Sequence, residues 1–148
     1  MDREFARSCF DRYSAGIYRY ALSILKRPGL SEDVLQETFL RLITRPAPGL
    51  TEETVQAWLY RVARNLCFDI LRQPGAEYTQ SVPIAPDEYA YLDLIAPLSQ
   101  AEQEIVTLKI VGNLTHREIA LILRTTPSAA QKRYERAIQK LRETEESK

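Results

Sequence analysis

The sequence predicts an all-α protein made of two small helical domains: an N-terminal helical bundle and a C-terminal helix-turn-helix. Apolar residues recur at helical spacing through the first 72 residues. Prolines interrupt residues 74–98, and capping signals divide the last fifty residues into short helices. At 148 residues the chain has room for two such units. We therefore expect domains at 1–73 and 99–148, joined by a linker at 74–98.

The N-terminal block contains three predicted helices. The first ends before Pro28-Gly29 and carries a regular apolar stripe: Phe5, Cys9, Tyr13, Ile17, Ala21 and Ile24. The second has Ser31 as its expected N-cap, acids in its first turn and an apolar face through Leu42. Thr51 is the expected cap of the third, whose stripe runs from Val55 to Ile70. Arg45–Gly49 is a predicted loop.

Residues 74–98 form the predicted linker, because four prolines break any long element and no periodicity survives. The segment holds four acidic residues and no basic one, a balance of −4. Residues 1–72 and 99–148 each have a balance of +2, so the zero net charge conceals an acidic belt between two mildly basic ends.

The C-terminal block contains three predicted capping boxes, in which a hydroxyl residue is followed three positions later by Glu or Gln. They are Ser99–Glu102, Thr115–Glu118 and Ser128–Gln131. Gly112-Asn113 closes the first helix, and Thr125-Thr126-Pro127 makes a tight turn before the last. A helix, a short helix, a tight turn and a longer helix are the layout of a helix-turn-helix.

The last helix divides into an apolar stripe and a basic face. Ala130, Tyr134, Ala137 and Leu141 predict the buried stripe. The N-terminal end of such a helix enters the major groove of DNA, where Gln can read adenine and Lys or Arg can contact guanine or phosphate. The predicted contacts to duplex DNA are Ser128, Gln131, Lys132, Arg133 and Arg136. The alternative is an ordinary solvated basic face.

The composition and the motifs argue against an enzyme, a metal-binding protein and a membrane protein. No catalytic constellation or phosphate-binding glycine loop stands out, so we expect neither an enzyme nor a cofactor. Cys9 and Cys67 lack a CxxC partner and are expected to be buried thiols, with no metal site. The charged start MDREFARSC and the lack of a long apolar run predict a cytoplasmic protein without membrane insertion.

Three segments in order resemble bacterial sigma factors of the extracytoplasmic-function (ECF) group, within the sigma-70 family. SEDVLQETFLRL (31–42) is similar to the segment that grips the clamp helices of RNA polymerase. AWLYRVARNLCFDILR (57–72) is similar to the segment that melts and reads the minus-ten element. LTHREIALILRTTPSAAQKRYERAIQKLRE (114–143) resembles the domain that reads the minus-thirty-five element.

The resemblance implies core RNA polymerase, through its clamp helices and flap, promoter DNA and an anti-sigma factor as partners. It implies polymerase contacts by Asp33, Gln36, Glu37 and Arg41. It implies minus-ten contacts by Arg61, Arg64, Asn65, Asp69 and Arg72. Asn65 and Asp69 could instead bond to each other, and the loop at 45–54 would hold a flipped base. The acidic linker would thread the RNA channel of the polymerase or act as a solvated tether.

The chain departs from the family at two places that bear on DNA. The basic residues that usually continue past Arg72 are replaced by Gln73-Pro74-Gly75-Ala76. Arg124 stands where the family usually has Gly, so it adds a phosphate contact or strains the turn if positive φ is needed there. Two other functions stay open: a sigma-like decoy that binds an anti-sigma factor, and a stand-alone helix-turn-helix regulator.

Overall fold

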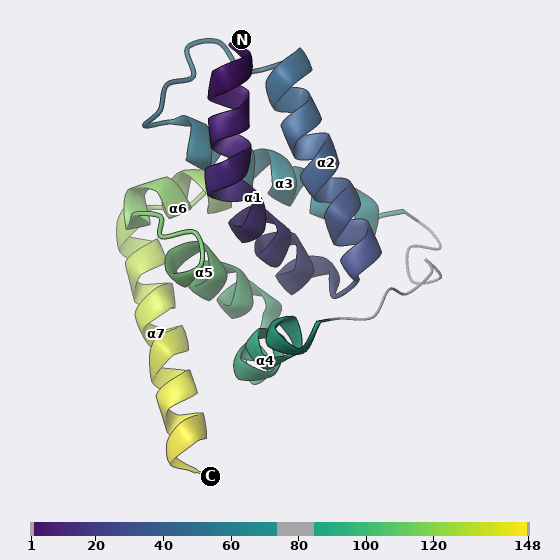
Figure 1. The fold of residues 1–148 in the computed structure, drawn as a ribbon. Coiled ribbons are helices and arrows are strands. Elements are labelled where there is room, and N and C mark those ends of the chain that lie inside the picture. The colour runs from purple at the N-terminus through teal and green to yellow at the C-terminus, as the bar shows by residue number, and fades with distance from the viewer. Residues whose placement is uncertain (1, 74–84, 148) are drawn as a thin grey trace.

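The structure, a computed structural model, describes residues 2–73 and 85–147, and the ordered elements in these ranges are all helices (Figure 1). Their bounds are α1 Arg3–Leu25, α2 Pro28–Thr44, α3 Val55–Leu71, α4 Pro86–Ile95, α5 Gln100–Ile110, α6 His116–Leu123 and α7 Pro127–Glu146. The predicted all-α class with an N-terminal bundle and a C-terminal helix-turn-helix is confirmed. None of the helices in the described ranges combines the length and apolarity that a bilayer crossing requires.

The N-terminal domain consists of α1, α2 and α3, each packed against the other two. Its centre is filled by fully buried side chains: Ile17, Val34, Leu42, Val55, Leu59 and Ala63. Cys9 and Cys67 are free and buried, as predicted, and desolvation raises the pKa of Cys67 to about 12. Both thiols therefore act as small apolar groups at neutral pH.

Two predicted helix starts in this domain are wrong. The N-cap of α2 is Arg27, and Pro28 occupies the first helical position, where its missing N–H costs no hydrogen bond. Ser31 lies inside the helix, buried, with Oγ donating to the Arg27 carbonyl at 2.7 Å. Helix α3 starts at Val55 rather than after Thr51, because residues 51–54 form a separate turn in which the Thr51 N–H donates to Thr54 Oγ1.

The sequence showed no helical periodicity in the linker and predicted no long element there, but its second half forms a short helix. Residues 86–95 form α4, whose first position is Pro86 and whose first turn carries two acids. Ile95 is fully buried, and the Tyr91 hydroxyl lies 2.7 Å from Thr107 Oγ1 on α5. Helical periodicity was missed because only one face of this short helix is anchored. Residues 74–84 of the linker lie outside the described residues.

The C-terminal domain packs α5, α6 and α7 together as a helix-turn-helix. The capping boxes at Ser99 and Thr115 form as predicted, with both reciprocal hydrogen bonds present. The third box is wrong: α7 is capped by Thr126, whose Oγ1 accepts from the Ala129 N–H at 3.1 Å, and Pro127 is the first helical residue. The predicted apolar stripe of α7 is buried or half-buried.

The two domains pack against each other and share a continuous core. Helix α5 lies along α1, and α6 lies against α3 (Figure 1). Polar side chains bridge the interface at several points: Gln56 Nε2 donates to the Gly112 carbonyl at 2.7 Å, and Gln100 Nε2 donates to the Ser23 carbonyl at 3.3 Å. Lys26 Nζ donates across it to Gln103 Oε1.

Candidate polymerase and nucleic-acid interfaces

The predicted polymerase contacts lie on one helix, α2. Asp33 and Gln36 are exposed, while Glu37 and Arg41 are partly exposed. Arg41 Nε and Glu37 Oε1 form an ion pair at 3.2 Å, one helical turn apart. Helix α2 packs chiefly on α1 and α3, so this mixed polar face stays accessible while the two domains are together.

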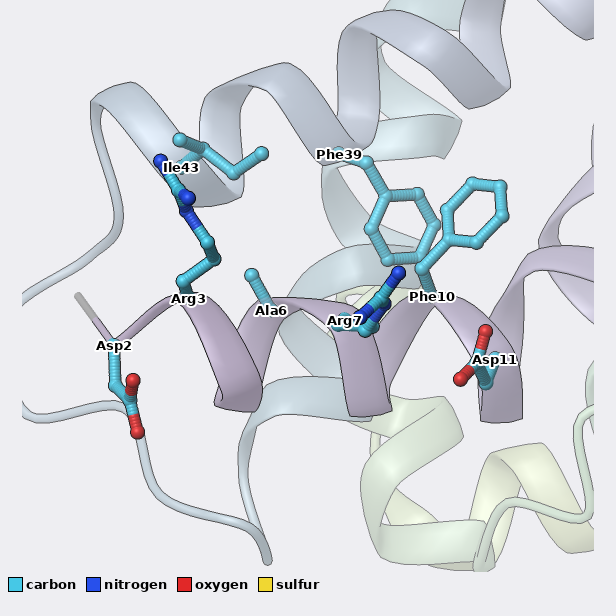
Figure 2. Close-up of a pocket in the computed structure, with 8 residues that line it drawn as sticks. All are labelled: Asp2, Arg3, Ala6, Arg7, Phe10, Asp11, Phe39 and Ile43. Atoms are coloured by element: carbon cyan, nitrogen blue, oxygen red, sulfur yellow. The ribbon is translucent and has the colours of Figure 1, made fainter.

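Sequence reasoning missed an apolar part of the same region. Leu40 and Ile43 on α2 are 52% and 60% exposed, and Phe10 on α1 is 46% exposed. Between the N-terminal half of α1 and the end of α2 lies a groove of about 790 Å³ (Figure 2). The Phe10 and Phe39 rings meet in it edge to face, 5.0 Å between centroids. Charged residues line its rim: Asp2, Arg3, Arg7 and Asp11.

The predicted minus-ten residues are spread along α3 in different environments. Arg61, Asn65 and Asp69 are exposed, as is Arg72 at the C-cap. Asp69 pairs with Arg72, so the alternative bond between Asp69 and Asn65 does not form. Both partners of that ion pair are more than half exposed, and surface pairs of this kind add little to stability. All four side chains are exposed, and the ion pair between Asp69 and Arg72 buries neither of its partners.

Arg64 is different, because it is held by the other domain. Its Nε donates to Glu104 Oε1 on α5 at 2.9 Å, and its guanidinium lies over the Phe68 ring at 4.7 Å. The same Glu104 oxygen accepts from the Tyr20 hydroxyl at 2.9 Å. The Glu104 side chain is 6% exposed and Tyr20 is fully buried, so desolvation, with Glu104 as the second cause, raises the Tyr20 pKa well above its usual value.

The loop expected to hold a flipped base also meets the C-terminal domain. A cavity of about 360 Å³ is lined on one side by the loop and the start of α3, including Leu50, Trp58 and Arg61. Its other side is formed by Glu118 and Leu121 of α6. Trp58 is half-buried against the core. In this arrangement α6 lies beside Trp58 and beside the loop at 45–54.

The predicted duplex contacts on α7 form an exposed face. Ser128, Gln131, Lys132, Arg133 and Arg136 are all exposed. Gln131 Nε2 donates to Glu135 Oε1 at 3.1 Å, and Arg133 and Arg136 flank Glu102 at the start of α5. Lys140, further along the same face, pairs with Glu102 at 3.1 Å. The first two turns of α7 therefore present amide and cationic groups without a buried partner.

The turn before α7 depends on a left-handed residue. Arg124 has φ 56° and ψ 51°, and its N–H donates to the Ala120 carbonyl, which ends α6. This conformation is one that glycine adopts without steric cost. The turn does need a positive φ at Arg124, which is the condition under which the sequence predicted strain there. The side chain is also exposed, so the predicted phosphate contact remains open to it.

Comparison with known proteins finds two family matches along the chain. Residues 9–76 match the family Sigma-70 region 2, and residues 89–141 match Sigma-70, region 4. The ECF RNA polymerase sigma factor SigL of Mycobacterium tuberculosis is 28% identical, over 93% of this chain and 87% of that protein. SigM of Bacillus subtilis, also an ECF sigma factor, is 38% identical over 49% of this chain and 44% of its own length.

A solved structure has the same fold. The sigma factor RpoE of Bartonella quintana, determined in complex with the anti-sigma factor NepR, superposes with a TM-score of 0.76 at 20% identity, covering 96% of each chain. Together the two family matches take in the helices of the described residues, except the start of α1, part of α4 and the end of α7. The chain belongs to the sigma-70 family, in its ECF group.

Proposed function

We propose that this chain is a dissociable, non-enzymatic specificity subunit that binds core RNA polymerase and directs it to promoters, where it supports melting and initiation. The observation that carries this is one chain presenting three surfaces: a polar and apolar face on α2, a cationic row on α3, and an exposed helix-turn-helix end on α7. The cytoplasm, where the polymerase works, is the compartment this function requires.

The α2 face supports docking on polymerase. Asp33, Gln36, Glu37 and Arg41 offer both charges and an amide, which suits a polar coiled coil such as the clamp helices. The exposed Leu40 adds apolar area next to them, and a docking surface gains most from apolar groups that become fully desolvated. The C-terminal domain is the proposed contact to the flap.

The α3 row supports binding to the minus-ten element. Arg61, Arg64 and Arg72 are cations for the strand backbone, while Asn65 and Asp69 can bond to unpaired base edges. On α7, Gln131 can read adenine, and Lys132, Arg133 and Arg136 can contact guanine or phosphate. Ser128 leaves room for close approach of the helix to the groove.

An anti-sigma factor is the proposed regulatory partner. Two proteins of similar structure were each solved with a partner: the sigma factor RpoE of Bartonella quintana with the anti-sigma factor NepR, and CnrH with the cytosolic domain of CnrY. The charge of zero across the chain supports a factor that binds DNA only after it has joined polymerase. The experiment must distinguish this sigma function from that of a decoy, which would bind an anti-sigma factor and never polymerase.

Run-off transcription with core polymerase on genomic promoter fragments tests the proposal. We expect transcripts only when the chain is added. The double variant Lys132→Ala/Arg136→Ala should lose dependence on the minus-thirty-five sequence yet still pull down polymerase. Arg142→Ala, an exposed cation near the far end of α7, is the matched control. A chain that captures an anti-sigma protein but never polymerase is a decoy.

A further inference from the structure

A further cavity lies where α1 and α3 meet the end of α5. Its volume of about 810 Å³ falls in the range of small-ligand sites, roughly 300–1,000 Å³. The described residues that line it include two arginines and no acidic residue, whereas the chain has 20 Lys or Arg and 20 Asp or Glu. None of the proposed contacts to polymerase or DNA lines it. The cavity is therefore a local excess of positive charge in a neutral chain.

A buried hydroxyl without a partner lines this cavity. Tyr60 on α3 is 1% exposed, and its hydroxyl forms no hydrogen bond within the described part of the chain. Burying a hydroxyl unpaired is unfavourable, because it loses its bonds to water. Desolvation, with Tyr13 as the second cause, raises the pKa of Tyr60, so the group stays protonated at neutral pH. It is therefore a hydrogen-bond donor available to a ligand.

Two glycines leave space around this hydroxyl. A Cβ on Gly16 of α1 would overlap with Tyr60 Oη, and a Cβ on Gly112 after α5 would lie 3.3 Å from it. Glycine inside a helix is unfavourable relative to alanine, so Gly16 has a packing reason at this position. Both domains therefore make room for the hydroxyl beside the cavity.

The two arginines lie on either side of Gly16 on one face of α1. Arg12 and Arg19 are seven residues apart, which separates their origins by about 10 Å along the helix. Both are exposed, and neither forms an ion pair within the ranges that the structure describes. Guanidinium groups bind phosphate oxygens through paired, charge-assisted hydrogen bonds. Their separation suits a chain of linked phosphates better than a single phosphate.

The end of α5 is the feature of the cavity that opposes an anion. The C-terminal dipole of a helix is equivalent to about half a negative charge, against two full positive charges on the arginines. Gln56 Nε2 also donates to the Gly112 carbonyl at 2.7 Å, which satisfies that oxygen. The balance therefore favours an anion. The Gln56 carbonyl oxygen and the Asn113 amide are left as polar groups for a base edge or a ribose.

Aromatic side chains lie next to the cations. Tyr13 on α1 and Tyr91 on α4 are half-buried and line the same cavity. The Tyr91 hydroxyl is paired with Thr107 Oγ1 at 2.7 Å, so its ring is what remains for a ligand. Burial raises the pKa of Tyr91, and the hydrogen bond with Thr107 and the charge of Arg19 oppose that shift, so this arginine lies near the ring. Tyrosine rings stack on flat heterocycles.

We propose that this cavity is a binding site for a nucleoside di- or triphosphate. The phosphates lie between Arg12 and Arg19 and accept a hydrogen bond from the Tyr60 hydroxyl. The base lies against Tyr13 and Tyr91. This inference does not depend on the proposed sigma function, because the residues that carry it are not among the proposed contacts to polymerase or DNA.

Calorimetric titration of the full chain with ADP and GDP tests the site, with pyrophosphate and adenosine as the two halves of the ligand. We expect one nucleotide per chain, bound at least about tenfold more tightly than either half. Nuclear magnetic resonance gives the location. The amide signals of Gly16 and Gly112 should move on binding, while that of Gly49, which lies outside this cavity, should not.

Arginine variants test the phosphate contacts. Arg12→Gln and Arg19→Gln should each weaken nucleotide binding by about tenfold or more, since charge-assisted hydrogen bonds are about twice as strong as neutral ones. Arg7→Gln is the matched control, because Arg7 is an exposed residue of the same helix that does not line the cavity. Its affinity should equal that of the wild type.

Tyr60→Phe tests the hydroxyl with two measurements. Nucleotide binding should weaken several-fold, and the melting temperature without nucleotide should not fall, because the hydroxyl has no partner in the described residues to lose. A merely structural hydroxyl would give the opposite pattern. Lys132→Ala/Arg136→Ala should bind nucleotide as the wild type does, because these cations belong to the DNA face of α7.

No binding of ADP or GDP at about 1 mM would overturn the site. Equal weakening by Arg7→Gln, or loss of binding in Lys132→Ala/Arg136→Ala, would assign the binding to general charge or to the DNA face and overturn it as well. Pyrophosphate bound as tightly as the nucleotides would overturn the contact with the base. A chain that binds nucleotide but never directs initiation keeps the site and refutes the sigma function.

Discussion

Replacing Arg124 with glycine should stabilise the protein, because this residue ends α6 in the left-handed conformation at φ 56°. For a residue with a side chain, that conformation costs about 1–2 kcal/mol. Glycine avoids this cost but loses about 0.5–1 kcal/mol through the greater freedom of the unfolded chain. We therefore expect Arg124→Gly to raise the free energy of unfolding by about 0.5–1 kcal/mol and the melting temperature by about 1–4 °C.

Thermal and urea unfolding measure the effect, and Arg124→Ala isolates its origin. Alanine removes the guanidinium but keeps the left-handed strain, so its stability should stay close to that of the wild type. If Arg124→Gly is no more stable than Arg124→Ala, the left-handed backbone at residue 124 does not destabilise the folded protein.

The same pair of variants tests the second role of Arg124. The exposed guanidinium precedes the DNA-facing end of α7, so a phosphate contact would explain why strain is retained there. In that case both variants should bind promoter DNA more weakly within the holoenzyme, and the salt dependence of binding should fall by about one ion. Unchanged affinity in both would exclude the phosphate contact.

Three other perturbations have expected outcomes. The raised pKa of Cys67, about 12 against an ordinary value of 9.0, means that the folded state keeps the thiol proton longer than the unfolded chain. Stability should therefore fall as pH rises from about 9 to about 12, and Cys67→Ala should show a shallower fall in urea titrations. Gly112→Ala should cost about 1–3 kcal/mol in unfolding free energy, since its Cβ would lie 2.6 Å from the Leu108 carbonyl oxygen. Leu40→Asp should weaken polymerase pull-down and leave the melting temperature unchanged, because this side chain is 52% exposed. If the variant binds polymerase as well as the wild type does, Leu40 is not part of the docking face.

Local sequence signals predicted most of the helices because their causes are local. The Ser99 and Thr115 capping boxes each involve residues three positions apart, and both form. Two of the three wrong starts share one cause. Pro28 and Pro127 each occupy the first helical position, so α2 begins three residues before Ser31 and α7 begins one residue before Ser128, the hydroxyl residues expected to cap them. Helix α4 was missed because its single buried face depends on α5.

The exposed polar faces of the candidate site were predictable from the sequence, but its exposed apolar residues and its contact between the domains were not. Exposure of the α2 and α7 faces follows from periodicity, because polar residues opposite an apolar stripe face solvent. The exposed apolar residues Phe10, Leu40 and Ile43 were not found, since periodicity alone does not say which apolar residue lacks a covering element. The capture of Arg64 by Glu104 was also beyond reach, because the two residues are forty positions apart.

The sequence by itself determined that this chain is helical, that it has two domains of the sigma-70 kind, and which faces carry polar and cationic groups. These follow from spacing, capping and motif order along the chain. Only the tertiary structure decided that the domains pack together and that Glu104 joins Tyr20 to Arg64 across the interface. A buried carboxylate selects its partners by position in space, and nothing in the order of residues states which donors the fold brings within 2.9 Å of it.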